Sequence, residues 1–450
     1  MDGLPEIIRG KKIAVIGAGR SGEAAAFLLG ERGASVFVSD QKPGSDALIQ
    51  QFRDKGIECE FGGHTDRIYE SDVWIISPGL SYHDEKYLKA KEKGISIYAE
   101  LEAASWFCKA PIVAVTGSNG KSTTTAWIGD MCRKAGKQTA VAGNIGHAFS
   151  LEVGQLPADG IAVLEVSNFQ LESIETFHPQ VALLLNLTPD HLDRHGSMAE
   201  YARIKARIFE NQTASDVLID NIEDPLVCEK ASAAKSRLWG FGLSPHKGDG
   251  ASIQDGMITV VIDQHKEYEF PASDIALPGK HNLQNAMGAM LAARALDLPR
   301  EAVAESLRTF KALAHRLEFV RELGGVRYYN DSKATNVDSV QYALQSFQNP
   351  VILIAGGRDK NSDFTLLNSL IRKHVKKGIL IGEAAEKMAQ AWDGLCDLES
   401  ASTLETAIRK AKSIAQKNDV VLLSPACASF DMFKNFEDRG DQFKQLVMQL

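Results

Sequence analysis

The sequence predicts an α/β protein of three domains, each built on a mostly parallel sheet. At 450 residues the chain exceeds what one hydrophobic core usually supports, so about two to four domains are expected. Short apolar runs alternate with helical stretches in three successive series, which is typical of βαβ units. A glycine-containing turn follows the first apolar run of each of the first two series, where α/β sheets commonly bind ligands.

The first series predicts a Rossmann-like domain over residues 1–100. Its apolar runs are 13–16, 35–39, 73–77 and 95–98. The stretch Gly17-Ala-Gly-Arg-Ser-Gly22 follows the first run, and Asp40 ends the second run 18 residues after Gly22. This spacing resembles a dinucleotide fingerprint, which taken alone would indicate an NAD-dependent enzyme. Glycines at such turns also allow close packing of a helix on a sheet, so that alternative stays open.

The second series contains the stretch TGSNGKSTTT, residues 116–125, between an apolar run and a helical pattern. Gly117 and Gly120 would let backbone N–H groups approach phosphate oxygens at a helix N-terminus. Lys121 would reach the β and γ phosphates, and the Ser122 hydroxyl would ligate Mg²⁺. Val115 stands where the usual motif has its first glycine. We predict a nucleotide-binding loop, with an ordinary Gly/Ser turn as the alternative.

Polar residues follow two further apolar runs of this second series. Glu165 ends the run 161–165, and His191 follows the run 181–185. The carboxyl ends of parallel strands share one edge of a sheet, so both side chains are expected near the phosphate loop, where they could hold a metal. The alternatives are an N-cap or surface carboxylate for Glu165 and an ordinary hydrogen-bonded imidazole for His191.

The rest of the chain completes the second domain and forms the third. Short strands with turns over 237–271 predict a β-rich appendage, and a long amphipathic helix follows from His281 to about Leu296. We predict that the central P-loop ATPase-type domain covers residues 101–312. A third α/β series, with apolar runs at 326–329, 351–355, 378–381 and 420–424, predicts a second Rossmann-like domain over 313–450.

Composition excludes several classes of function. The longest apolar runs are about strand length, far below the ~18 residues of a membrane span. The N-terminal residues lack the apolar region of a secretory signal, so we expect a cytoplasmic protein. Six scattered cysteines without a C-x-x-C pair indicate neither a zinc ribbon nor a disulfide framework. The net charge of −8 and the lack of basic runs with aromatics argue against a nucleic-acid partner.

Two predicted phosphate-binding loops in one chain favour an enzyme with two nucleotide sites. A dehydrogenase would not need a second, ATP-type loop, so we infer that ATP at one site acts on a nucleotide-bearing substrate at the other. His315-Arg316 and the segment 330–336 open the third domain, where their positive groups could reach ATP phosphates. Interdomain salt bridging is the alternative. Lys205 lies on a basic amphipathic helix, and the pattern alone gives it no special role.

Read in order, nine motifs resemble those of the Mur ligases of peptidoglycan synthesis, most closely the branch that adds D-glutamate. They are TGSNGKST, EVSNFQLE, NLTPDHLDRH, YARIKARIF, GKHNLQNA, HRLE, NDSKATN, GGRDKNSDF and SPACASFDMFKNFEDRG. The resemblance extends from Gly17 to Gly440. It implies an ADP-forming amide ligase that joins D-glutamate to UDP-N-acetylmuramoyl-L-alanine through an acyl phosphate and a tetrahedral intermediate. It also implies a role in cell-wall synthesis, cell shape and division, with small-molecule substrates and a monomeric enzyme.

The resemblance also implies roles for individual residues. ATP would contact Gly117, Asn119, Gly120, Lys121, Ser122, Thr123, Asn282, Asn285, Arg316, Asp331 and Lys333. Two Mg²⁺ ions would be held by Ser122, Glu165, His191 and a carbamylated Lys205. The catalytic residues would be Lys121, His191 and Lys205. The UDP-sugar would contact Arg20, Ser21, Asp40, Gly79, Asn144 and Ser167, and D-glutamate would contact Thr335, Lys360, Ser429 and Phe436.

One departure and three rivals accompany this interpretation. The family pattern has Thr and Arg where Gln41 and Lys42 follow Asp40, and a lysine offers a point charge in place of a planar fork. The nearest rival is a sister Mur-type or folylpolyglutamate-type ligase for another amino acid, although the D-N-P-R element of the meso-diaminopimelate type is missing here. An NAD-dependent oxidoreductase would explain only Gly17 to Asp40, and a catalytically silent scaffold on this fold is the third rival.

Overall fold

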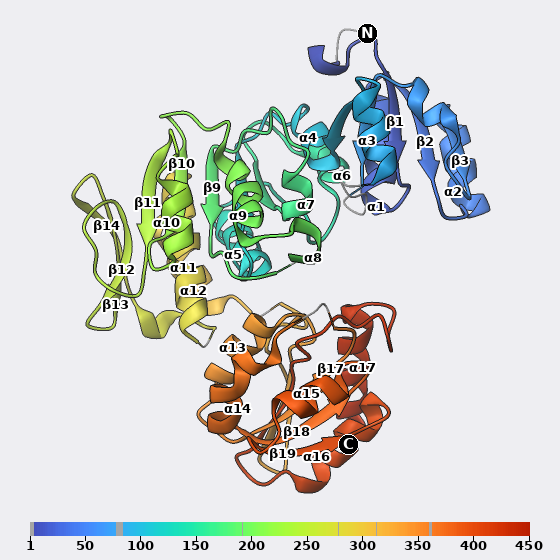
Figure 1. Cartoon of the computed structure of the whole chain (residues 1–450). Helices are drawn as coiled ribbons and strands as arrows, with labels where there is room; N and C mark the ends of the chain where they lie inside the picture. The colour runs from blue at the N-terminus through green and yellow to red at the C-terminus, as the bar shows by residue number, and fades with distance from the viewer. Residues whose placement is uncertain (1–3, 78–83, 191, 278, 312, 360–361) are drawn as a thin grey trace. The chain divides into compact units, whose positions relative to one another are not determined.

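Three separate β-sheets organise the protein. The computed structural model describes residues 4–77, 84–190, 192–277, 279–311, 313–359 and 362–450. Each sheet is flanked by helices and occupies its own stretch of the sequence, as the colours of Figure 1 show. The predicted α/β class with three domains is therefore confirmed. No helix within these described ranges combines the length and the apolar character that a membrane crossing requires.

The N-terminal sheet has five parallel strands in the order β3-β2-β1-β4-β5. The strands are β1 (Lys12–Ile16), β2 (Ser35–Asp40), β3 (Glu58–Phe61), β4 (Val73–Ile76) and β5 (Ser96–Ala99). The helices are α1 (Arg20–Glu31), α2 (Asp46–Asp54), α3 (Glu85–Glu92) and α4 (Glu100–Ser105), with 3₁₀ turns η1 (Glu6–Ile8) and η2 (Asp66–Glu70). The strand order reverses at β1, so the loops after β1 and β4 flank the point where such sheets bind ligands.

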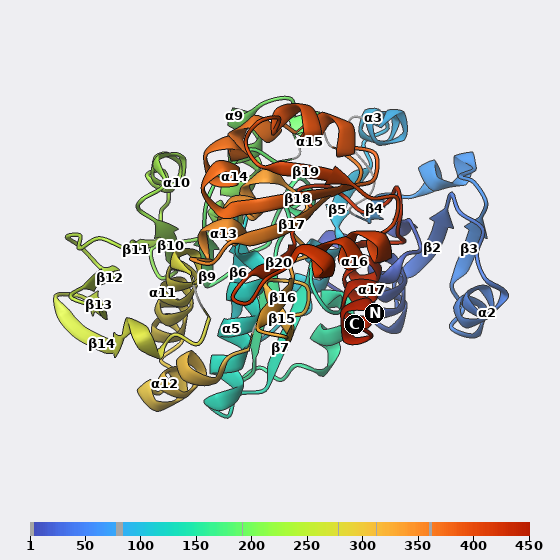
Figure 2. The ribbon, with the colours of Figure 1, turned by 90° about the horizontal axis from the view of Figure 1, so that it is seen from below.

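The central sheet has nine strands in the order β14-β13-β12-β11-β10-β9-β6-β8-β7. The strands are β6 (Ile112–Thr116), β7 (Thr139–Gly143), β8 (Ile161–Glu165), β9 (Val181–Leu184), β10 (Val217–Asn221), β11 (Arg237–Phe241), β12 (Gly250–Gln254), β13 (Met257–Ile262) and β14 (His265–Pro271). Neighbours pair in parallel from β7 to β12, and β12, β13 and β14 form an antiparallel meander. This meander is the predicted β-rich appendage, and it lies at the edge of the sheet in both views (Figure 2).

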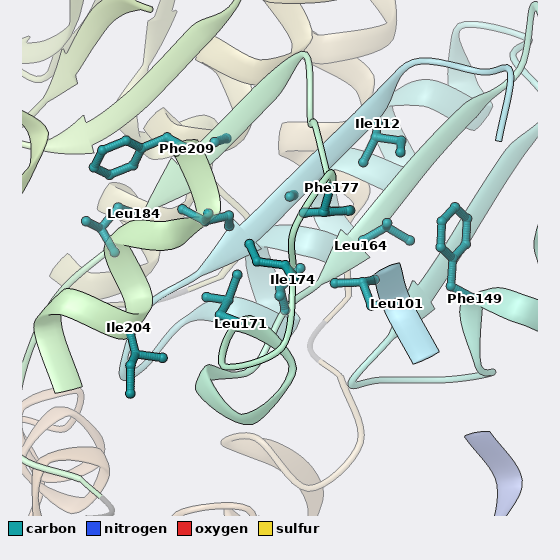
Figure 3. Close-up of a cluster of buried hydrophobic side chains, with 14 of the residues drawn as sticks. Leu101, Ile112, Phe149, Leu164, Leu171, Ile174, Phe177, Leu184, Ile204 and Phe209 are labelled. Atoms are coloured by element: carbon teal, nitrogen blue, oxygen red, sulfur yellow. The ribbon is translucent and has the colours of Figure 1, made fainter. Parts of the chain in front are cut away.

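Helices cover both faces of the central sheet. They are α5 (Lys121–Lys134), α6 (Phe149–Glu152), α7 (Asn168–Leu171), α8 (Leu192–His195), α9 (Met198–Ala206), α10 (Pro225–Ala231), α11 (Lys280–Ala295) and α12 (Arg300–Thr309), with η3 (Val153–Gln155), η4 (Arg207–Phe209) and η5 (Ala272–Asp274). All five residues of β6 are buried, as expected for the middle of a parallel sheet. One apolar cluster joins side chains from these strands with α7, α9 and Phe177 (Figure 3). Because Leu101 belongs to the same cluster, α4 packs onto the central domain.

The C-terminal sheet has six strands in the order β15-β16-β20-β17-β18-β19, and only the β15–β16 pair is antiparallel (Figure 2). The strands are β15 (Glu318–Leu323), β16 (Val326–Asn330), β17 (Val351–Gly356), β18 (Val375–Ile381), β19 (Asp397–Ser400) and β20 (Val420–Leu423). The helices are α13 (Val337–Gln345), α14 (Asn368–His374), α15 (Ala385–Ala391), α16 (Leu404–Ile414) and α17 (Phe436–Met448), with η6 (Phe364–Leu367). The loops after β16, β17 and β20 therefore open at one edge of the sheet.

Candidate active site

The predicted phosphate loop joins β6 to the N-terminus of α5. Gly120 caps α5 in a left-handed conformation with φ 83°, which glycine adopts without strain. The loop is braced by Asn186 after β9, whose Oδ1 accepts from the Asn119 N–H at 2.7 Å and whose Nδ2 donates to the Asn119 carbonyl at 3.0 Å. The Ser118 N–H bonds the Asn186 carbonyl at 2.9 Å. The loop thus has a fixed shape at a helix N-terminus, which suits an anionic ligand.

Two lysines contact this loop: Lys121, which follows it directly in the sequence, and Lys205, which lies on a distant helix. Lys121 Nζ donates to the Gly117 and Ser118 carbonyls at 2.9 and 2.8 Å. Lys205, on α9, is 1% exposed, and its Nζ donates to the Gly117 carbonyl at 2.8 Å. The helical pattern around Lys205 gave no reason to expect burial, because a basic amphipathic helix usually keeps its lysines in water. The structure places both amines on one loop carbonyl.

Glu165, at the end of β8, is buried with 1% exposure. Its Oε1 accepts from Asn144 Nδ2 at 2.6 Å, and its Oε2 has no hydrogen-bond partner among the described residues. A buried carboxylate oxygen without a partner is costly, and Mg²⁺ prefers such hard oxygen ligands. Glu165 is therefore a candidate ligand for Mg²⁺, and Ser122, on the first turn of α5, is a second buried oxygen donor of the predicted set. Within the described ranges no cluster of three or more His, Cys, Asp or Glu side chains is close enough to hold a metal.

The segment after β8 is ordered by its own caps. Ser167 forms a capping box with Gln170, in which the Gln170 N–H bonds the Ser167 hydroxyl at 3.3 Å and the Ser167 N–H bonds Gln170 Oε1 at 3.0 Å. Asn144, predicted to contact the UDP-sugar, is exposed beside Glu165 and also bonds the Glu165 carbonyl through its N–H at 2.9 Å. Asn144, Glu165 and Ser167 are thus brought together at the carboxyl edge of the central sheet.

The glycine loop after β1 is held by close backbone packing. A methyl carbon added at Gly22 would lie 1.8 Å from the Gly17 carbonyl oxygen, so only glycine fits at this position of α1. Asp40 accepts from the Ala18 N–H at 2.5 Å and from the Lys42 N–H at 2.7 Å, and Ser77 donates to the Gly17 carbonyl at 3.2 Å. The Asp40 carboxylate therefore braces the loop through backbone groups.

Of the other residues of this sheet predicted to contact the UDP-sugar, the structure describes Arg20 and Ser21. Arg20 and Ser21 form the first turn of α1, and Arg20 is exposed beside the glycine loop. Gly79 lies outside the described residues, as do His191 and Lys360 of the other predicted sites. The structure thus gathers Arg20, Ser21 and Asp40 at the point where the strand order reverses.

Asn282 and Asn285 lie on α11, and both are buried. A methyl carbon added at Gly120 would be 2.4 Å from Asn285 Oδ1, so this amide lies directly against the phosphate loop. Thr123, on the first turn of α5, is also buried. Asn285 therefore lies against the loop that the sequence assigns to ATP.

In the C-terminal domain, Asp331 is buried where β16 ends. It accepts from the Ser424 hydroxyl at 2.8 Å and from the Leu317 N–H at 3.1 Å. Burial raises the pKa of Asp331 to about 7, and these hydrogen bonds and nearby arginines, including Arg316, oppose the shift. His315 adopts a left-handed conformation with φ 64°, and its Nδ1 lies 3.0 Å from Asn330 Nδ2.

Three of the residues predicted to contact D-glutamate, Thr335, Ser429 and Phe436, are described in this domain, together with Lys333 of the predicted ATP site. Lys333 Nζ lies 3.7 Å from the centroid of the Phe436 ring, and the Phe436 carbonyl accepts from the Ser332 hydroxyl at 2.8 Å. Thr335 follows on the same loop, with its N–H bonded to the Lys333 carbonyl at 2.8 Å. Ser429 is buried in the loop after β20. The structure brings Lys333 and Phe436 together from motifs about a hundred residues apart.

Three residues, two beside the phosphate loop and one in the C-terminal domain, carry contacts that the sequence did not predict. Asn186 braces the phosphate loop, and the Tyr201 hydroxyl lies 3.1 Å from the Ser118 hydroxyl. Arg439 is fully buried and donates to the Ser332 hydroxyl and carbonyl at 2.9 Å each and to the Cys427 carbonyl at 3.2 Å. Tyr201 stands four residues before Lys205 on one helix face, a signal that could have identified it. Asn186 lies in the NLTPDHLDRH motif and Arg439 in SPACASFDMFKNFEDRG, yet only tertiary contacts reveal their partners.

A glycine-containing loop at a helix N-terminus, with a buried carboxylate at the end of a strand of the same sheet, is the arrangement of P-loop enzymes that use ATP. The comparisons with known proteins give the family. The model described as Mur ligase middle domain matches residues 115–293, Mur ligase, glutamate ligase domain matches 315–427, and MurD N-terminal domain matches 12–86. The chain belongs to the Mur ligase family.

Individual relatives cover almost the whole chain. The UDP-N-acetylmuramoylalanine--D-glutamate ligase of Salinibacter ruber is 44% identical, over 98% of this chain and 99% of that protein. The protein of the same name from Pelotomaculum thermopropionicum is 43% identical, over 98% of each chain. Among solved structures, a pseudomurein peptide ligase type C from Methanothermus fervidus is 20% identical with a TM-score of 0.63, covering 98% of this chain and 100% of that one. This last likeness concerns the fold.

Proposed function

We propose that this protein joins D-glutamate to UDP-N-acetylmuramoyl-L-alanine in peptidoglycan precursor synthesis, converting ATP to ADP and phosphate. The observation that carries the proposal is the identity of 44%, over nearly the full length of both chains, to a protein named for this reaction. The cytoplasmic location and the monomeric state stay predictions.

The reaction needs an activated carboxylate, because a free carboxylate is a poor electrophile. The L-alanyl carboxylate attacks the γ-phosphorus of ATP, ADP leaves, and an acyl phosphate forms. The amine of D-glutamate then attacks the acyl carbon, loses a proton, and expels phosphate from the tetrahedral intermediate. The protein mainly positions the reactants and compensates their charge. Lys121 and the N–H groups of the loop ending at Gly120 would hold the phosphate oxygens.

Ser122 and Glu165 would hold Mg²⁺, and the Glu165 oxygen that has no hydrogen-bond partner among the described residues supports this assignment. The bound ion would supply positive charge to the phosphates that react. His191 and Lys205 would complete a second metal site. For Lys205 this requires carbamylation, in which CO₂ adds to the uncharged amine and one proton leaves, so that a cation becomes a carboxylate-like ligand. The burial of Lys205 on the loop carbonyl supports a role at this place.

The substrate contacts stay proposals by position. Arg20, Ser21, Asp40, Gly79, Asn144 and Ser167 are assigned to the UDP-sugar, and Thr335, Lys360, Ser429 and Phe436 to D-glutamate. Asn119, Thr123, Asn282, Asn285, Arg316, Asp331 and Lys333 are assigned to ATP. Both Asp40 carboxylate oxygens also accept from backbone N–H groups, so a contact with the UDP-sugar would share these oxygens.

ATP-dependent phosphate release with UDP-N-acetylmuramoyl-L-alanine tests the proposal, with product mass as the readout. D-glutamate is compared with L-glutamate, L-alanine and meso-diaminopimelate. Release and a mass gain with D-glutamate alone are expected. Turnover with another amino acid would identify a sister ligase, and no turnover in a preparation that binds ATP would reject this acceptor.

A further inference from the structure

A buried group of polar and aromatic side chains lies beside the phosphate loop and takes no part in the proposed chemistry. Its centre is His195, the last residue of α8, whose side chain is completely buried. His195 Nε2 lies 2.5 Å from Asn168 Nδ2 on α7. Because the amide nitrogen donates, Nε2 accepts, and a neutral ring carries its proton on Nδ1. Nδ1 faces Glu172 Oε1 at 3.8 Å.

Glu172 is itself held firmly. Arg194 donates to its two carboxylate oxygens at 3.1 and 2.5 Å, and both side chains are largely buried. The Arg194 guanidinium also lies 4.3 Å from the centroid of the Phe169 ring. Arg207, which follows α9, donates to the Glu172 carbonyl at 2.8 Å. These contacts tie α8 and the end of α9 to the turn after α7.

Tyr201 connects this group to the active site. Its ring centroid lies 5.6 Å from that of His195, and the residue is 1% exposed. Its hydroxyl lies 3.1 Å from the Ser118 hydroxyl in the phosphate loop. Lys205 Nζ lies 4.9 Å from the centroid of the same ring and bonds the Gly117 carbonyl. The orientation of the Tyr201 ring therefore affects both the loop and the buried lysine.

We propose that His195 is a positioning residue, which fixes the Tyr201 ring and through it the places of Ser118 and Lys205. The importance of Lys205 rests on the proposed function. Burying an imidazole, a carboxylate and a guanidinium costs desolvation energy that an apolar filling would avoid. A buried group held by directed hydrogen bonds, such as those of Asn168 to His195 and of Arg194 to Glu172, instead favours a single arrangement, which suits a group that must hold another in place.

The test compares His195→Leu and Tyr201→Phe, alone and combined, with His178→Leu as the matched control. His178 pairs with Asp216 at 2.7 Å just before β9, at the opposite edge of the same sheet. We expect each of the first two variants to lower kcat about 10- to 100-fold, as losses of supporting contacts typically do. The double variant should be no worse than the worse single one. KM for D-glutamate should be unchanged in these variants, and the His178→Leu control should keep the wild-type kcat. His195→Gln can accept a hydrogen bond from Asn168, so it should recover part of the loss in kcat.

The proposal would be overturned if the fold-losses in kcat of the two single variants multiplied in the double variant. It would also be overturned if His195→Leu lowered only the melting temperature and left kcat unchanged. ADP affinity by calorimetry supplies a readout independent of ligation. If the wild-type protein does not ligate D-glutamate, the proposed function fails by itself. The positioning role then requires that His195→Leu and Tyr201→Phe both weaken ADP binding about tenfold, as lost supporting contacts do. Unchanged ADP affinity in that case overturns it.

Discussion

Replacing Gly120 by alanine tests the phosphate loop most directly, because Gly136 offers a matched control at the other end of α5. Both glycines have a left-handed backbone, with φ 83° at Gly120 and 74° at Gly136. A methyl carbon at Gly120 would lie 2.4 Å from Asn285 Oδ1 and 3.4 Å from Leu185 Cδ1. At Gly136 it would meet no atom of the described residues within 4 Å. The two substitutions share the backbone strain and differ in the space around the side chain.

The size of each effect follows from these contacts. A left-handed alanine costs about 1–2 kcal/mol of stability, and both variants should lose about that amount. At Gly120 the loop or Asn285 must also move to relieve the short contact. Displacing one backbone N–H from a phosphate oxygen would remove a charge-assisted hydrogen bond worth about 1.5–3 kcal/mol. This corresponds to a Kd for nucleotide that is about 10- to 100-fold higher.

Calorimetric titration with Mg²⁺-ADP measures this difference, and thermal unfolding of each variant reports its stability. We expect Gly136→Ala to bind ADP as the wild type does, and Gly120→Ala to bind it at least tenfold more weakly. Circular dichroism checks that both variants are folded at the assay temperature. Equal ADP affinity in the two folded variants would show that the loop does not contact the phosphates.

Three further predictions concern buried polar groups. Glu165→Gln keeps an oxygen for Asn144 but loses its charge, so nucleotide binding should require more Mg²⁺; an unchanged Mg²⁺ titration would exclude Glu165 as a ligand. Lys205→Ala should lose phosphate release and regain part of it with added short-chain carboxylic acids; no recovery would count against carbamylation. Because burial raises the pKa of Asp331 from 3.8 to about 7, its contribution to stability should fall as pH rises across that range. The melting temperature of Asp331→Asn relative to the wild type should therefore be higher at pH 8 than at pH 5, and a difference independent of pH would contradict the shift.

The sequence predicted those parts of the molecule that depend on local pattern. Buried parallel strands appear as continuous apolar runs, so the three series were recognisable, and the strand, glycine and helix around Gly120 identified the phosphate loop. The β-rich appendage followed from turns spaced along 237–271. The placement of Glu165 at the carboxyl edge also followed, because a parallel sheet brings all such ends to one side.

Tertiary packing decided the rest. The basic pattern around Lys205 indicated a solvated helix face, yet α9 turns this lysine inward against Gly117. The pairing of Lys333 with Phe436 joins the loop after β16 to the start of α17, and no local pattern predicts such a contact. Periodicity reports which face of a helix is apolar, whereas a buried polar residue depends on partners supplied by distant segments.

This distinction explains why the positioning residue was harder to find than the residues it positions. Glycine loops and catalytic carboxylates follow rules of spacing, because phosphates and metals impose a geometry on the chain. His195 contacts Asn168 and Tyr201, and neither contact requires a fixed spacing in the sequence. Burying the His195 imidazole without hydrogen bonds would cost desolvation energy. Such a residue is therefore stable only where α7, α8 and α9 meet and supply complementary groups. A residue of this kind is recognised from its contacts, and the His195 and Tyr201 double-variant cycle measures whether those contacts reach the phosphate loop.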